Sequence, residues 1–86
     1  MGKFIYSNGS YLIGCFVDGY LEGNGLYHGS SGEKYEGQFK KGLFHGDGTF
    51  TAVNKSQLKI NWVKNKPHGS GLLIVGSKSN SQVVNY

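Results

Sequence analysis

The sequence YEGQFKKGLFHGDGTF at residues 35–50 decides the fold. In its first half, Tyr35, Gly37 and Phe39 fall on one face of an extended chain, and the polar residues between them fall on the other. An alternation of period two is typical of a half-buried β-strand. Residues 41–46 contain a turn, after which the alternation resumes. The stretch therefore predicts a β-hairpin.

This hairpin pattern recurs with a period of 23 residues along nearly the whole chain. The period joins three sets of residues: Phe16, Phe39 and Trp62; Gly23, Gly46 and Gly69; and Gly25, Gly48 and Gly71. A repeat of this length usually forms one small supersecondary unit stacked on copies of itself. Glycine interrupts every window that could show helical periodicity. The sequence thus predicts an all-β fold, an elongated antiparallel meander of stacked β-hairpins.

The 86 residues predict a single domain of such repeats. We place the parts at about residues 10–29, 33–52 and 56–75 for the repeat units, 2–7 for a partial unit and 76–86 for a tail. The tail offers a last strand through Val83 and Val84, or a frayed end. In the third unit Asn65 replaces the turn glycine, and asparagine tolerates a positive φ better than most residues.

The residues offer no converging set for catalysis or metal binding. Cys15 lies in an apolar strand without a second group to orient a base beside it. His45 and His68 are equivalent by period, with Glu22 in the same row, but neighbouring hairpins repeat at about 9–10 Å. Such a spacing is too wide for ligands of one ion. We therefore expect no catalytic residues, no metal and no cofactor.

The repeat residues resemble the MORN repeat, whose pattern is close to Y-x-G-x-F-x-x-G-x-x-H-G-x-G followed by an aromatic residue two positions later. Residues 35–50 match every position, the first unit has Leu12 and Glu22 in place of Tyr and His, and the third loses the strand glycine. The resemblance covers about residues 2–75. It implies an elongated stack of β-hairpins used for protein–protein contact, scaffolding and dimerisation. Phospholipid binding has also been proposed for such repeats.

The row of aromatic side chains is the best candidate for function. If the sheet curves, part of this face becomes a shallow groove lined by rings and glycines, which suits an apolar helix or extended peptide of a partner. We predict a non-catalytic protein-binding or scaffolding module, and an alternative in which the rings form only the core stays open. The predicted contact residues are Tyr11, Tyr27, Tyr35, Phe39, Phe50 and Trp62.

The charge distribution supports an alternative class of partner. Residues 1–33 carry one lysine against three acidic residues, and residues 34–86 carry eight lysines against two. A membrane-surface adaptor would bind anionic phospholipids through this Lys-rich half. The lysines assigned to that role are Lys40, Lys41, Lys55, Lys59, Lys64 and Lys66. The chain has no arginine, and acidic residues interrupt the basic field, so nucleic acid is disfavoured.

Self-association is a further expectation. The second face of the first unit is apolar, where the second unit is charged, and both ends of a meander leave open edge strands. The apolar residues of that face are Tyr11, Ile13, Cys15 and Val17. No signal-peptide pattern follows Met1, and no apolar run approaches the about 20 residues of a membrane helix. We expect a cytoplasmic location, with the periphery of a membrane or the cytoskeleton left open.

Overall fold

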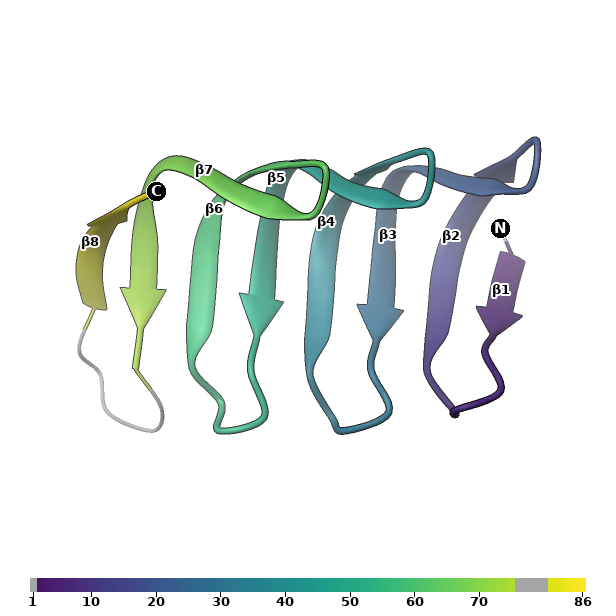
Figure 1. The fold of residues 1–86 in the computed structure, drawn as a ribbon, viewed down its shortest axis with the longest axis horizontal. Helices are drawn as coiled ribbons and strands as arrows, with labels where there is room; N and C mark the ends of the chain where they lie inside the picture. Colours follow the sequence, from purple (N-terminus) through teal and green to yellow (C-terminus); the bar gives the residue numbers. More distant parts are fainter. Residues whose placement is uncertain (1, 76–80) are drawn as a thin grey trace.

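The computed structural model describes residues 2–75 and 81–86, and it confirms the all-β meander. One antiparallel sheet holds eight strands in sequential order, without helices among the described residues (Figure 1). The strands are β1 (Gly2–Ile5), β2 (Tyr11–Val17), β3 (Tyr20–His28), β4 (Lys34–Lys40), β5 (Leu43–Thr51), β6 (Gln57–Val63), β7 (Lys66–Ile74) and β8 (Ser81–Asn85). β1 lies in the predicted partial unit. β8 forms the predicted last strand, although residues 76–80 of the tail lie outside the described residues.

The three repeat hairpins close with tight two-residue turns. The turn residues are Asp18–Gly19, Lys41–Gly42 and Lys64–Asn65, and all six have positive φ. Two successive positive φ angles define the mirror-image type I′ turn, whose twist matches that of paired strands. The predicted turn between 41 and 46 is therefore confined to two residues. Asn65 has a φ of 70°, as expected for a residue that replaces glycine there.

Each hairpin bends near its turn. The pairing register shifts between Gly14 and Cys15, between Gly37 and Phe39, and between Lys59 and Asn61, and such bulges bend a strand and increase its twist. We call the part between each bulge and the turn the short arm, and the rest of the hairpin the long arm. The short arms turn across the sheet and point toward β1 (Figure 1). The side inside the bend is the inner face, and the opposite side is the outer face.

Hydrogen bonds fix the second and third short arms to the hairpin that precedes each of them. The amide of Gly42 donates to the carbonyl of Leu21 at 3.0 Å, and the amide of Asn65 donates to the carbonyl of Phe44 at 3.0 Å. The Asn65 side chain adds a third bond, because its Oδ1 accepts from the Phe44 amide at 2.8 Å. The turns of the second and third repeats thus hold the preceding repeat as well as their own strands.

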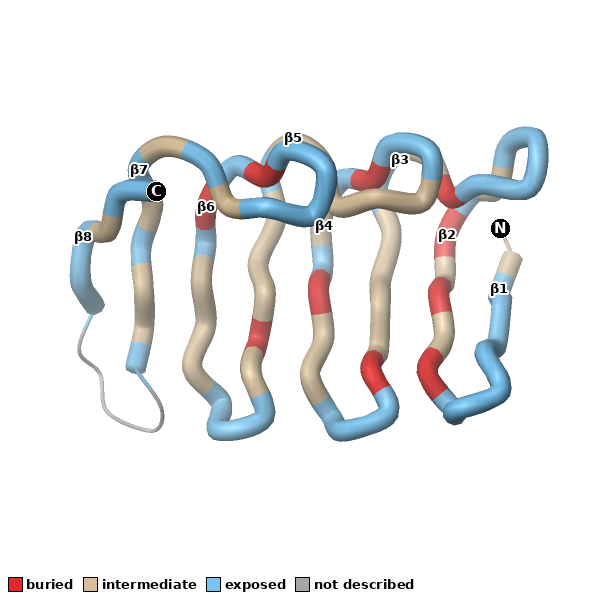
Figure 2. Tube along the Cα trace, viewed as in Figure 1, coloured by how far each residue is buried: buried red, intermediate tan, exposed pale blue. Residues whose placement is uncertain are grey.

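The core fills the inside of the bend. Its buried apolar residues are Leu12, Leu21, Tyr35, Phe39, Ile60 and Trp62. Buried positions lie in the middle of the sheet, whereas β1 and β8 are largely exposed (Figure 2). The Tyr35 ring lies against Gly48, where an added Cβ would sit only 2.5 Å from its Cε2 atom. Glycine at this position therefore makes room for the ring on the strand.

Candidate functional site

The inner face carries a groove between the long arms and the turns. One hollow of about 400 Å³ has Tyr27 and Phe50 on its long-arm side and Gly42 and Asn65 on its turn side. A second hollow, of about 270 Å³, continues it toward β1. The two hollows share Tyr6, Leu12 and Gly42. We call this continuous surface the inner groove, defined by Tyr6, Leu12, Tyr27, Gly42, Phe44 and Phe50.

Three of the six predicted contact residues belong to the core. Tyr35 is 0% exposed, Phe39 3% and Trp62 6%. Phe39 and Trp62 lie on the short arms, and together with Phe44 their rings pack onto Tyr35 of the long arm. Their burial agrees with the alternative in which the rings form the core. Tyr27 and Phe50, in contrast, are half-buried and line the inner groove.

Tyr11 lies on the outer face, apart from the other predicted contact residues. Its ring stacks on that of His28 with centroids 4.9 Å apart, and the Lys3 ammonium lies 4.5 Å from its centroid. Along the same face Cys15 and Val17 are exposed, while Ile13 is half-buried. The predicted outer apolar surface is therefore present at these positions, and its role in self-association stays a prediction.

Two members of the inner face were not among the residues predicted from the sequence. Leu21 is 0% exposed and packs into the core, and Phe44 stacks on Tyr35 with ring centroids 3.9 Å apart. Both belong to a row with the same 23-residue spacing, completed by Pro67. The 23-residue spacing of this row was the signal that could have identified them. Both residues lie beside the turns, outside the alternating stretches from which the inner face was predicted.

The Tyr35 hydroxyl is buried and donates a hydrogen bond to the Gln38 carbonyl at 2.8 Å. Desolvation by burial raises the pKa of Tyr35 from 10.0 to about 12. The folded state thus holds its proton more tightly than the unfolded state does.

We therefore expect the contribution of Tyr35 to the free energy of unfolding to be fully present below pH 10. It should be lost as the pH rises from about 10 to about 12. Denaturant titrations across this range measure the loss. Tyr35→Phe keeps the ring but removes the ionisable hydroxyl, so its stability should decline less over the same interval. An equal decline in both proteins would show that Tyr35 does not cause it.

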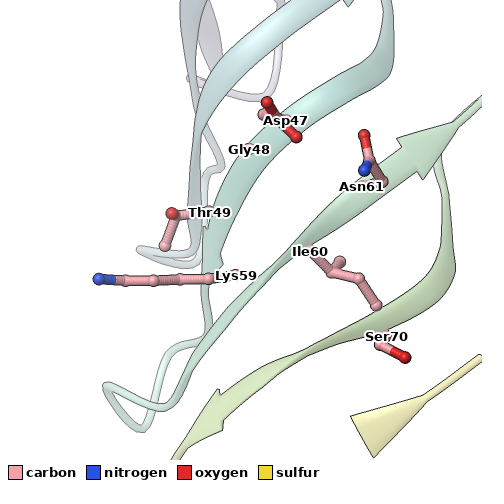
Figure 3. Close-up of a pocket in the computed structure, with 7 residues that line it drawn as sticks. All are labelled: Asp47, Gly48, Thr49, Lys59, Ile60, Asn61 and Ser70. Carbon is pink, nitrogen blue, oxygen red and sulfur yellow. The ribbon is translucent and has the colours of Figure 1, made fainter. Parts of the chain in front are cut away.

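A separate hollow of about 450 Å³ is lined by residues of β5, β6 and β7 next to the third bulge. Asp47, Asn61 and Ser70 contribute its polar side chains, and Lys59 extends away from Asp47 and Asn61 (Figure 3). The hollow is wide open and has few apolar side chains. It therefore lacks the anchors by which grooves bind apolar segments.

The six lysines of the membrane alternative do not form one surface. Lys40, Lys41 and Lys64 surround a hollow of about 200 Å³ with Leu43 and His45 on the short arms. Lys66 follows the same turn as Lys64 at the start of β7, whereas Lys55 lies in the β5–β6 loop and Lys59 at the polar hollow.

Metal binding finds no support in the part of the chain that the structure describes. There, no three side chains of His, Cys, Asp or Glu come close enough to hold an ion. The described residues also contain no helix with the length and apolarity needed to cross a membrane.

The comparison with known families identifies the repeat. The MORN repeat model matches residues 13–34, 35–57 and 61–74. A comparison with curated proteins finds no significant match. MORN repeats are non-enzymatic modules that take part in protein or membrane association. Because the three matched segments together cover more than half of the residues, the chain belongs to the MORN repeat family.

Proposed function

We propose that this chain is a protein-binding module whose inner groove takes an apolar helix or extended segment of a partner. The observation that carries the proposal is the aromatic lining of the groove by side chains that are only half-buried, chiefly Tyr27 and Phe50. Aromatic side chains contribute large contact areas, and they commonly dominate the binding energy of protein interfaces.

The charges around the groove favour an apolar ligand over a charged one. Glu33 and Lys41 are the charged residues among those that line its two hollows, one in each. The hydrogen-bonded turns at Gly42 and Asn65 form the opposite wall, which gives the groove a fixed width. A preformed groove needs little ordering on binding, and this lowers the cost of association.

The test compares two tyrosines on opposite faces. Peptides of 16 residues, selected from a random displayed library on the wild-type protein, serve as the probe. We expect Tyr27→Ser to weaken their binding about tenfold or more, the effect of losing an aromatic anchor. Tyr11→Ser removes a ring of equal size from the outer face and should leave affinity unchanged. If Tyr11→Ser weakens binding and Tyr27→Ser does not, the groove is not the site.

The short-arm lysines support a second candidate function at a membrane surface. Lys40, Lys41 and Lys64 gather around the partly apolar hollow beside Leu43, and each lysine near an anionic bilayer contributes about 1 kcal/mol. Binding to phosphatidylserine vesicles that is lost at high salt would favour this function. Lys41→Glu should then abolish it, whereas Lys55→Glu, in the loop at the opposite end of the hairpins, should not.

A further inference from the structure

The two outermost strands of the sheet are the two halves of one repeat. The second strand of every repeat hairpin carries a glycine: Gly25, Gly48 or Gly71. This glycine pairs with a residue in the first strand that follows, as Gly25 pairs with Gly37. Gly2 of β1 makes this pairing with Gly14, so β1 corresponds to a second strand. Val84 of β8 makes it with Gly71, so β8 corresponds to a first strand.

Both strands expose their outer edges and many apolar side chains. No described strand lies beyond β1 or β8. Large hydrophobic side chains concentrate at these two ends: Phe4 is 51% exposed, Ile5 63% and Val83 73%. Natural edge strands are usually protected by charge or proline, but β8 has neither and β1 carries only Lys3.

We propose that two copies of this chain associate head to tail, with β1 of one copy pairing antiparallel to β8 of the next. The repeat sets the register: Gly2 lies opposite Val84, as Gly25 lies opposite Gly14 within one hairpin. Lys3 then lies opposite Val83, and Ile5 lies opposite Ser81. The pair of Val84 with Gly2 would place a β-branched residue beside a glycine. The third repeat has the same arrangement, because Ile60 lies beside Gly71.

In this register the outward-directed N–H and C=O groups of β1 lie opposite those of β8. The Tyr6 amide donates to the Ser10 carbonyl, so alternation along β1 directs the backbone groups of Lys3 and Ile5 away from β2. Tyr86 and Gly69 exchange two hydrogen bonds, so Val83 and Ser81 likewise direct theirs away from β7. The outward groups therefore meet as pairs that each exchange two hydrogen bonds.

Such a contact joins different surfaces and does not close on itself. A heterologous contact of this kind yields open linear assemblies rather than symmetric dimers. Because the ladder is short, we expect a Kd on the order of 100 µM, at the weak end for protein interfaces. Sedimentation velocity of the whole chain over rising protein concentrations should show stepwise growth beyond a dimer.

Proline variants test the two edges separately. Lys3→Pro and Val83→Pro each remove one outward amide, which an edge strand tolerates, and each should abolish growth when alone in solution. An equimolar mixture has one intact β1 and one intact β8, so it should form dimers and stop there. Lys3→Thr and Val83→Thr retain the amide and should assemble like the wild type.

The outcomes separate this model from others. A wild-type chain that remains monomeric at about 1 mM, ten times the expected Kd, overturns the proposal. Dimers formed by either proline variant alone would show a symmetric contact through the remaining edge and would overturn it as well. Far-UV circular dichroism checks that each variant is folded, and Ile5→Pro replaces Lys3→Pro if the latter is not.

Discussion

Gly48→Ala should destabilise the protein by about 3 kcal/mol or more, near the upper end for overpacked cores. The new methyl group would enter the space of the Tyr35 ring, 2.5 Å from its Cε2 atom and closer still to its hydroxyl. Tyr35 cannot retreat, because Phe44 stacks on it and both Phe39 and Trp62 pack edge-on against it. For a domain of this size, the loss corresponds to a fall in Tm of about 12 °C or more.

Two variants make the result specific. Thr49→Ala changes the next residue, which lies on the outer face, and should shift stability by no more than about 0.5 kcal/mol. A double-mutant cycle with Tyr35→Leu removes the ring that the methyl group meets. Gly48→Ala should then cost much less, giving a coupling energy of about 1–3 kcal/mol between the two positions. Equal costs in both backgrounds would mean that the steric conflict with Tyr35 is not the cause.

Most of the fold could be predicted from the 23-residue repeat, because the features that define one unit are local in sequence. Strand alternation, turn residues and the spacing of glycines are all visible in a single unit, and they led to the hairpin, the meander and the replacement of a turn glycine by Asn65. The repeat also places glycines beside the aromatic positions of the strands, where a side chain would conflict with a ring. Gly48 beneath Tyr35 shows this physical role.

The bend could not be predicted in the same way. A bulge places two residues of one strand against one of its partner, so it depends on the pairing of two strands and leaves the alternation of each nearly intact. At the bulge of the second repeat, the Gln38 side chain accepts a hydrogen bond from the Asp47 amide at 3.1 Å. The sequence alone therefore left open whether Tyr35, Phe39 and Trp62 line a groove or form the core, and in the bent hairpins they are buried.

The bend also explains why the candidate site is narrower than the aromatic row. Short arms cover the middle of the row and leave only its margins open, which is why Tyr27 and Phe50 line the groove while Tyr35 does not. Any function of the inner face thus depends on how firmly the short arms are held. Phe44 is the residue that connects them most directly to the long arms.

Phe44→Ala should cost about 3 kcal/mol, the lower end for removing a phenylalanine from a core, because the ring is partly exposed. Phe44 lies in the short-arm part of β5, and it stacks on Tyr35 and packs against Phe39, Trp62 and Tyr27. Its loss leaves a cavity where the two arms meet. Leu43→Ala, one residue earlier and on the outer face, should cost no more than about 1 kcal/mol.

Trp62 reports directly on this change, since it is the only tryptophan of the chain and its indole donates to the Gly48 carbonyl at 3.2 Å. Denaturant unfolding followed by its fluorescence measures the stability of Phe44→Ala. The emission of the folded variant shows whether the short arm has detached. A red shift before global unfolding would show that arm docking is lost separately from the sheet. A variant as stable as the wild type would contradict the prediction, because hydrogen bonds at Gly42 and Asn65 would then suffice to hold the bend.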